Sequence, residues 1–388
     1  MKKSLIALAV AGAFAAPAFA ATSNVDIYGV ISFAVEETNG YQGNDTGNSK
    51  FSPQVTDRVS RIGFKGSEDL GGGLKGIWQV EYQLNATTNE QLGSVAYNYG
   101  PVSRQTLRNT FVGLSGGFGT VLMGRHDTPY KLGTGSLDPF ADTLADYNAM
   151  PDGVALVDAI HDYRSPQALA YISPTWSGFH FAVAAVMSNS SVNLQTDNTL
   201  DAISGTAIYS NGPLFLSASY QDVYLSDLGL KDSKAWKLGA GYTFGDLKVG
   251  AVYENVDNTV LGVSSFAGDM SLSNNSTAFM FDGQTDRKSW LINAAYTMGP
   301  IVLKAEYGRA KLDAYTGVGA YVDTHGHATV AGARAKRDQS AWALGVDYNL
   351  SKRSTVYALY TVGDNDNNGA TSNGGDVSGF ALGIKHSF

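Results

Sequence analysis

The sequence predicts an all-β protein, a 16-stranded antiparallel transmembrane β-barrel formed by one domain. Three observations lead to this prediction. Period-two segments of about ten residues recur along the chain, and a tilted strand needs about that length to cross a bilayer. Short turns and longer connections alternate between these segments. No stretch beyond residue 20 is apolar enough to form a helix that crosses a membrane.

The N-terminal residues predict an export signal over 1–20. Lys2 and Lys3 precede an apolar run, and the small-residue site Ala18-Phe19-Ala20 follows it. The run is too short for a spanning helix, which needs about 20 apolar residues. We therefore expect cleavage between Ala20 and Ala21 and a mature barrel over 21–388.

Composition supports β-structure and excludes several classes of protein. The chain holds 45 Gly, 21 Tyr and 17 Phe, and only 16% of its residues are charged. The absence of Cys excludes a disulfide scaffold and thiolate metal sites. The net charge of −8 argues against a nucleic-acid partner.

The clearest alternation lies in the third predicted strand, at 74–85. One face carries Leu74, Gly76, Trp78, Val80, Tyr82 and Leu84. The other carries Lys75, Ile77, Gln79, Glu81, Gln83 and Asn85. The first face suits lipid and the second suits water, and the segments at 214–224 and 301–311 divide in the same way.

The full pattern predicts sixteen strands and seven tight turns. The strands are expected at 25–37, 58–68, 74–85, 104–115, 120–125, 167–173, 179–189, 201–210, 214–224, 234–244, 247–256, 287–298, 301–311, 338–349, 354–362 and 377–388. The tight turns are expected at 69–73, 116–119, 174–178, 211–213, 245–246, 299–300 and 351–353. The other eight connections are longer, and a membrane barrel shows this asymmetry, with its short turns on the periplasmic side. Because a sheet edge cannot be exposed to lipid, the last strand must pair with the first.

At this point the chain resembles the general porins of Gram-negative bacteria, the trimeric sixteen-stranded type of beta- and gammaproteobacteria. The resemblance covers essentially the whole chain. Its motifs are Val25 to Gly29, Ser60 to Gly71, Phe111 to Gly119, Gly124-Arg125, Tyr171 to Pro174 with Ser177 to Phe179, and Gly383 to Phe388. The resemblance implies an outer-membrane homotrimer that passes ions and small hydrophilic solutes, has no enzymatic activity and contacts lipopolysaccharide.

The last predicted strand carries a candidate assembly signal. One face of this strand holds Phe380, Leu382, Ile384, His386 and Phe388, so the chain ends on an aromatic residue. In the family that the chain resembles, such a strand implies recognition by the barrel assembly machinery.

The longest predicted connection, from His126 to Pro166, is the candidate constriction. The resemblance implies that this third external loop folds back into the barrel. Seven aspartates stand against Lys131 and Arg164, which gives the loop a net charge of minus five. These aspartates are Asp127, Asp138, Asp142, Asp146, Asp152, Asp158 and Asp162. Apolar anchors interleave with them at Phe140, Leu144, Tyr147 and Met150; the alternative is an external, solvated loop.

The early strands supply basic residues opposite this loop. They are Arg58, Arg61, Lys65, Arg104, Arg108 and Arg125. Alternation places Arg61 and Lys65 on the water-facing side of one strand. We therefore expect a constriction formed by Arg61, Lys65, Arg108, Arg125, Asp127, Asp138, Asp142, Asp146 and Asp152. The acidic loop predicts a weak cation preference, against which the wall arginines act; each arginine is alternatively a rim residue bound to lipopolysaccharide or paired with a carboxylate.

Two rival functions stay open. A substrate-specific channel would use aromatic side chains along the path, and Tyr130, Phe140 and Tyr147 are candidates. An outer-membrane enzyme would need a nucleophile with a histidine base, and none of the six histidines lies in such a motif. His325 and His327 without a third ligand are more typical of a solvated loop than of a metal site. We expect no catalytic residue, no cofactor and no metal.

Overall fold

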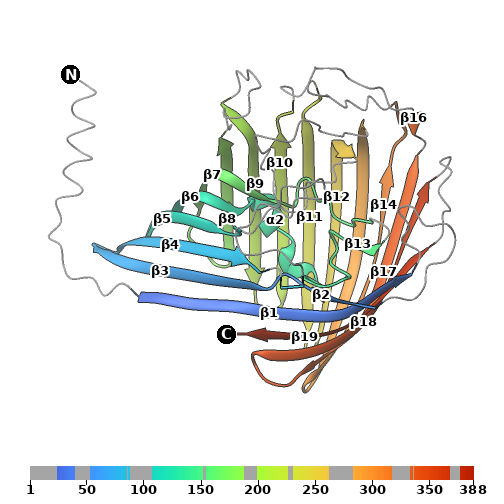
Figure 1. Cartoon of the computed structure of the whole chain (residues 1–388). Coiled ribbons are helices and arrows are strands. Elements are labelled where there is room, and N and C mark those ends of the chain that lie inside the picture. The colour runs from blue at the N-terminus through green and yellow to red at the C-terminus, as the bar shows by residue number, and fades with distance from the viewer. Residues whose placement is uncertain are drawn as a thin grey trace.

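The computed structural model describes residues 24–39, 53–84, 86–87, 107–151, 154–187, 199–225, 230–261, 283–316, 333–334, 336–367 and 376–388. One large sheet of seventeen hydrogen-bonded strands organises them (Figure 1). Two of these strands, β2 and β3, both pair with β1 and form one interrupted barrel strand. The closed antiparallel barrel therefore has sixteen strands, which confirms the predicted fold class.

The strands of the barrel follow each other in chain order. Their bounds are β1 Asn24–Asn39, β2 Gln54–Asp57, β3 Arg61–Gly71, β4 Leu74–Gln83, β5 Thr110–Gly116, β6 Gly119–Asp127, β7 Arg164–Ile172, β8 Phe179–Met187, β9 Leu200–Asn211, β10 Leu214–Val223, β11 Ser233–Phe244, β12 Leu247–Leu261, β13 Gly283–Met298, β14 Ile301–Leu312, β17 Arg337–Asn349, β18 Ser354–Asn367 and β19 Val377–Ser387. A separate two-stranded ribbon pairs β15 (Tyr315–Thr316) with β16 (Ala333–Arg334). The short helix α2 (Pro129–Leu132) and the 3-10 turn η1 (Gly135–Leu137) follow β6.

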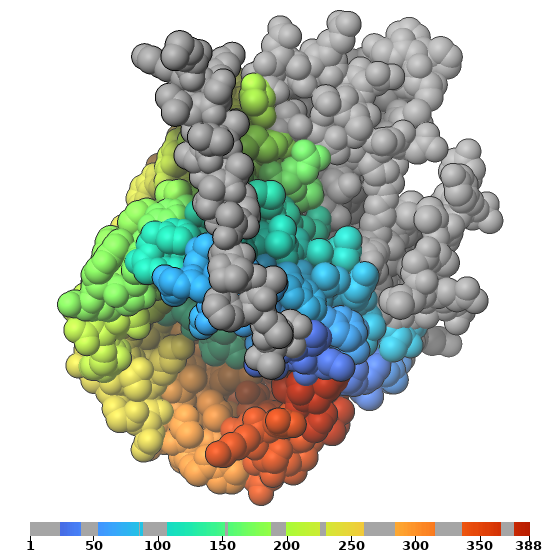
Figure 2. Space-filling model, turned by 90° about the vertical axis from the view of Figure 1, so that its left-hand side faces the viewer, coloured from blue at the N-terminus to red at the C-terminus, as the bar shows by residue number. Residues whose placement is uncertain are grey.

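The first and last strands close the barrel. β1 pairs with β19 from Val30 opposite Ser387 to Asn39 opposite Ser378. The backbone N–H of Gly29 also donates to the carbonyl of Phe388 at 3.1 Å. Figure 2 shows the blue N-terminal strands directly against the red C-terminal strands. This closure leaves no unpaired edge at the junction, as a lipid environment requires.

Alternation along the strands gives the barrel two different faces. On β13, Trp290 and Ile292 are exposed, whereas Ser289 and Leu291, which alternate with them, are buried. The same division recurs around the barrel, so large apolar side chains gather on one face, called here the apolar face. The residues that alternate with them form the opposite face. This is the binary pattern of a strand with lipid on one side.

The seven tight turns lie where the sequence predicts them, each between two consecutive strands. The turn after Asn211 has only two residues, and Gly212 at its start has a φ of 57°. Gly245 and Gly299 take φ values of 60° and 58°. Two-residue hairpin turns require this left-handed backbone, which glycine adopts without steric cost.

Three strands are four or five residues longer than predicted: β12 ends at Leu261, β13 begins at Gly283 and β18 ends at Asn367. Two other predicted strands differ near the candidate constriction. The strand expected at 104–115 begins only at Thr110. The strand expected at 58–68 is interrupted before Arg61, because Val59 has a φ of 61° and the hydroxyl of Ser60 accepts the backbone N–H of Ser32 at 2.9 Å. This interruption turns the side chains of Arg58 and Arg61 to the same face although they are three residues apart.

The long connection is shorter than predicted. β6 continues to Asp127 and β7 begins at Arg164, because the ladder resumes after a bulge with His126 opposite Ser165. The connecting segment is therefore 128–163, called here the loop segment. Within the described part of the chain, no helix has the length and apolar character to cross a membrane.

Candidate functional site

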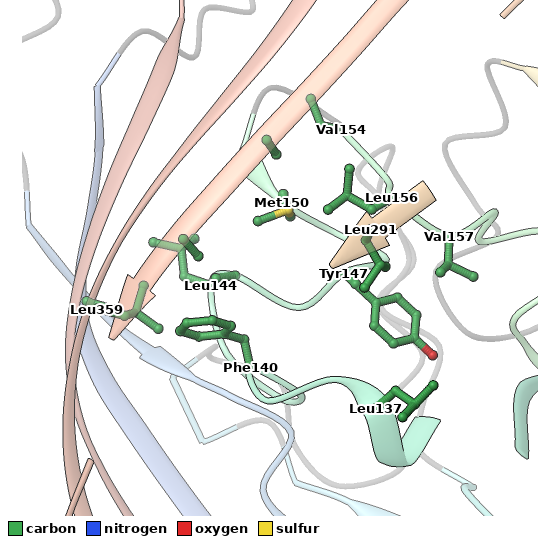
Figure 3. Packing of buried hydrophobic residues seen from close by; sticks show 14 of the residues in the cluster. Leu137, Phe140, Leu144, Tyr147, Met150, Val154, Leu156, Val157, Leu291 and Leu359 are labelled. Carbon is green, nitrogen blue, oxygen red and sulfur yellow. The ribbon is translucent and has the colours of Figure 1, made fainter. Parts of the chain in front are cut away.

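The loop segment packs against the opposite face of the barrel. Its four predicted anchors are all buried, with Phe140 at 0% and Tyr147 at 2% exposure. Figure 3 shows Phe140 and Leu144 beside Leu359 of β18. The apolar anchors thus bind the segment to strands from the C-terminal half of the barrel, which burial of apolar surface stabilises.

Glycines on the strands make room for these anchors. A Cβ atom at Gly345 would lie 2.7 Å from Cε1 of Phe140, and one at Gly308 would lie 2.8 Å from Cδ1 of Leu156. No real Cβ contact is this short, so a larger residue would displace the segment. The strand glycines therefore form part of the seat of the segment.

Two predicted constriction aspartates stabilise the turns of the loop segment itself. The carboxylate of Asp138 accepts the backbone N–H groups of Phe140 at 2.7 Å and Tyr147 at 3.2 Å. That of Asp146 accepts those of Asp142 at 3.1 Å and Asn148 at 3.0 Å. Burial, together with the charge of Asp146, raises the pKa of Asp138 well above its usual range, and burial also raises the pKa of Asp146.

A buried ion pair anchors the C-terminal end of the segment. Nζ of Lys237 on β11 lies 2.6 Å from Oδ1 of Asp162, and both side chains have 0% exposure. Oδ2 of Asp162 accepts the hydroxyl of Tyr147 at 3.2 Å and the amide of Asn148 at 3.0 Å. A charge pair this deep is stable only because hydrogen bonds surround it.

Glu254 on β12 forms a second buried anchor. Its Oε1 accepts the hydroxyl of Tyr130 at 2.8 Å. Its Oε2 lies 2.5 Å from the guanidinium of Arg287 and accepts the backbone N–H of Asp158 at 2.8 Å. Thr259 donates to Oδ2 of Asp158 at 2.6 Å. One glutamate thus holds both the start and the end of the loop segment.

His161 is buried between β10 and β11. Its Nε2 lies 2.9 Å from the hydroxyl of Ser233, and the amide of Gln221 donates to its carbonyl at 3.1 Å. Burial lowers the pKa of His161 to about 4. The imidazole is therefore neutral at pH 7.

The other side of the barrel carries ion pairs that water reaches. NH1 of Arg61 lies 2.9 Å from Oδ2 of Asp142, with side-chain exposures of 20% and 27%. This pair joins the wall to the loop segment, and it unites two residues of the predicted constriction.

Neighbouring arginines are also paired with carboxylates. Nε of Arg108 lies 2.5 Å from Oε1 of Glu81, and Arg58 pairs with Glu36. Asp127 lies 2.9 Å from Arg164, which ties the ends of β6 and β7. The alternative that each arginine pairs with a neighbouring carboxylate therefore holds for these side chains.

The remaining predicted residues have different places. Lys65 is exposed, and its Nζ lies 5.2 Å above the ring of Tyr28. Arg125 lies opposite Thr110 in the ladder of β5 and β6. Asp152, Arg104, His325, His327 and the cleavage residues Ala20 and Ala21 lie outside the described residues.

The candidate assembly signal lies on the apolar face of β19. Phe380, Leu382, Ile384 and Phe388 are 46%, 54%, 50% and 41% exposed. Nδ1 of His386 lies 2.8 Å from the hydroxyl of Ser354. In the structure Phe380, Leu382, Ile384 and His386 alternate with less exposed positions along the strand, and exposed Phe388 follows it.

Sequence reasoning missed most partners of the loop segment. Lys237, Glu254 and Arg287 contact the segment directly, and Glu36 and Glu81 pair with the wall arginines beside it. The sequence feature that could have identified them is a charged residue on the face of a predicted strand that alternates with the apolar face. In the described ranges, no group of three histidine, cysteine or acidic side chains could hold a metal ion.

A closed antiparallel barrel with an apolar exterior and a charged opposite face defines an outer-membrane β-barrel channel. The chain belongs to the Gram-negative porin family, whose model matches residues 7–368. It is 28% identical over 374 residues to a major outer membrane protein P.IB of Neisseria gonorrhoeae, covering 92% of each chain. It is 26% identical over 404 residues to the outer membrane porin protein 32 of Delftia acidovorans, covering 100% of each.

Solved structures have the same fold. The anion-selective porin from Comamonas acidovorans superposes with a TM-score of 0.64 at 21% identity, covering 94% of this chain and 100% of that one. The trimer form of OmpT from Vibrio cholerae gives a TM-score of 0.59 at 16% identity, covering 94% and 99%. The family match makes the protein a porin of the outer membrane.

Proposed function

We propose that the protein is a general diffusion porin whose loop segment lies inside the barrel and narrows a water-filled channel for ions and small hydrophilic solutes. The contact of Arg61 with Asp142 carries this proposal, because it joins the barrel wall to the segment by a pair of charges that water still reaches. A partly hydrated pair of opposite charges is what a pore constriction needs to order water and polar solutes.

The burial of the three aromatic candidates for a substrate-specific path favours a general channel over a substrate-specific one. Tyr130 and Phe140 are 0% exposed, and Tyr147 is 2% exposed. Their rings serve as anchors of the loop segment and do not face water. A guiding file of aromatic side chains therefore has no support from these three residues.

We propose an anion preference, in place of the weak cation preference that the charge count alone predicts. Most segment aspartates are engaged by backbone N–H groups or buried cations. In two wall pairs the cation is the more exposed partner: Arg58 is 27% exposed against 5% for Glu36, and Arg108 is 16% against 9% for Glu81. In the contact of Arg61 with Asp142 the two exposures are similar, at 20% and 27%. Lys131 is likewise more exposed than Asp127, at 32% against 14%. A solved relative is itself named as an anion-selective porin.

Reversal potentials in planar bilayers test both parts of the proposal. The purified protein should form open channels, and a potassium chloride gradient should give the sign of chloride preference. The preference should weaken as salt rises, because screening shortens the reach of the wall charges. Cation selectivity would overturn the assigned preference, and the absence of conductance by the folded protein would overturn the channel.

The remaining proposals concern export and assembly. We propose cleavage after Ala20, recognition of β19 by the barrel assembly machinery, contact with lipopolysaccharide, and a homotrimer like the trimer form of OmpT. Channel recordings give a direct test of the trimer, since one assembly should close in three equal steps. Single-step closures at all voltages would contradict it.

A further inference from the structure

A cavity of about 320 Å³ opens between β1, β3, β4 and β5, away from the contact of Arg61 with Asp142. Its lining includes Asp26, Lys65, Ser67, Ile77, Gln79 and Phe111. Small-molecule pockets begin at about 300 Å³, so the size suits one small solute. Lys65 is four residues from Arg61 toward the short turn of β3 and β4, which places the cavity on the turn side of the proposed constriction.

The strand register aligns the functional groups of the cavity. Asp26 pairs with Lys65, Lys65 with Gln79, and Gln79 with Phe111. Directly paired residues of antiparallel strands project to the same face, with Cβ atoms about 5 Å apart. A carboxylate, an ammonium group, an amide and an aromatic ring therefore form one row across four strands.

The two charges of this row are not joined in an ion pair. Asp26 and Lys65 are both exposed. Among the described residues, no opposite charge lies within ion-pair distance of either one, and the ammonium of Lys65 lies over the ring of Tyr28. Neighbouring Cα positions with separated charged ends leave a site for a solute that carries both charges close together.

We propose that this cavity binds a zwitterionic amino acid with an apolar side chain. Its carboxylate contacts Lys65, its ammonium group contacts Asp26, and its side chain lies against Phe111 and Ile77. Gln79 and Ser67 supply further polar contacts. The inference rests on the proposed channel only for delivery of the solute to the cavity.

Calorimetric titration of the folded protein in detergent at pH 7 tests the site. The probes are L-phenylalanine, 3-phenylpropionate, which lacks the amine, and phenethylamine, which lacks the carboxylate. L-Phenylalanine should bind about fivefold more tightly than either analogue, the effect of one exposed charge contact.

Substitutions assign each contact of the ligand. Asp26→Asn should remove the preference for phenylalanine over 3-phenylpropionate, and Lys65→Met should remove its preference over phenethylamine. Phe111→Ala should reduce the preference for phenylalanine over glycine. The matched control is Lys75→Met, an exposed lysine on the same face of β4 that does not line the cavity.

Three results would overturn the site: no heat of binding for phenylalanine, equal affinity for all three probes, or an unchanged preference in both charge variants. Each variant is first checked for wild-type heat-modifiable mobility in gels, which reports a folded barrel. Because calorimetry does not require conduction, a failure of the proposed channel and a failure of this site give different results.

Discussion

The two sides of the opposite face use the same ion-pair chemistry for different purposes. Arg61 on β3, and Arg108 beside β4, belong to pairs that are partly exposed to water. On β11 to β13, Lys237 and Arg287 belong to pairs that the loop segment covers completely or almost completely. Water screens the pair of Arg61 with Asp142, so this pair contributes little to stability but keeps an electric field that a solute can sense.

The second set depends on complete burial. A buried charge that loses its partner carries a large desolvation cost, so each pair makes the position of the loop segment nearly all-or-none. One side of the barrel therefore holds the segment in place, and the other side is free to set selectivity. The predictions below test this division.

The largest effect is expected for Lys237→Met. This change leaves Asp162 buried without its cation, which should cost about 3–5 kcal/mol of stability. Thermal unfolding in detergent, followed by heat-modifiable gel mobility, measures it. Lys234→Met is the matched control, because the side chain of Lys234 is 52% exposed in its pair with Asp222 and should contribute less than about 1 kcal/mol.

The double variant Lys237→Met with Asp162→Asn sharpens this test. Removing both charges also removes the unpaired carboxylate, so part of the lost stability should return. A double variant no more stable than Lys237→Met alone would show that packing, and not the charge pair, anchors this end of the segment.

The next largest effect concerns pH and His161. Its pKa lies at about 4, below the ordinary value of 6.5, so the folded protein takes up this proton less readily than the unfolded chain. Its contribution is fully present above about pH 6.5 and is lost as pH falls toward 4, by an amount on the order of 3 kcal/mol. His161→Gln should reduce the change of the unfolding midpoint with pH across this range, whereas His386→Gln on the apolar face should not.

The Asp138 carboxyl responds to pH in the opposite direction. Because its pKa is raised above 3.8, its contribution is greatest in acid and decreases as pH rises. Acid weakening of the segment between pH 6.5 and 4 therefore points to His161. If His161→Gln keeps the full pH dependence, the buried histidine is not its source.

A smaller effect is expected for Gly345→Ala. The added methyl group would meet the ring of Phe140 at 2.7 Å and should cost about 1–3 kcal/mol by overpacking. We expect a displaced loop segment and a larger, noisier single-channel conductance. Gly205→Ala is the control, since its nearest neighbours would lie 3.8 Å away. Wild-type conductance in both variants would mean that Phe140 does not position the segment.

Much of the barrel could be predicted because strand alternation is a local property. Trp78 and Val80 alternate with Gln79 and Glu81 whatever the rest of the chain does, and Asn211-Gly212 specifies its turn without distant contacts. The interruption before Arg61 could not be predicted, because it depends on the hydrogen bond between Ser60 and Ser32 on the neighbouring strand.

The site was predictable only in part, for the same reason. The apolar anchors such as Phe140 were recognisable, because an apolar residue in a long polar loop needs a surface to pack on. The strand residues that these anchors pack against, and the ion-pair partners of the segment, were not recognisable. Gly345 and Lys237 have no local feature that separates them from other residues on the same face of their strands. Only the path of the loop segment selects them, and that path comes from contacts far apart in the sequence.

The smallest expected effect on stability, and the most informative one for selectivity, is that of Arg61→Gln. The change removes a cation and releases the partly exposed carboxylate of Asp142, so chloride preference should fall by up to about fivefold in permeability ratio. Stability should change by less than about 1 kcal/mol, since both side chains reach water. Reversal potentials measure the first quantity, and unfolding midpoints measure the second.

Arg309→Gln is the matched control for Arg61→Gln, because Arg309 is exposed on the apolar face and carries the same charge. A reversal potential that shifts equally in both variants would mean that net charge, and not the wall beside the loop segment, sets selectivity. A large loss of stability in Arg61→Gln would also contradict the division between anchoring and selectivity. The water-accessible pair would then anchor the segment, as the pair of Lys237 with Asp162 does. A shift in selectivity confined to Arg61→Gln, with stability unchanged, is the result that the two-sided arrangement requires.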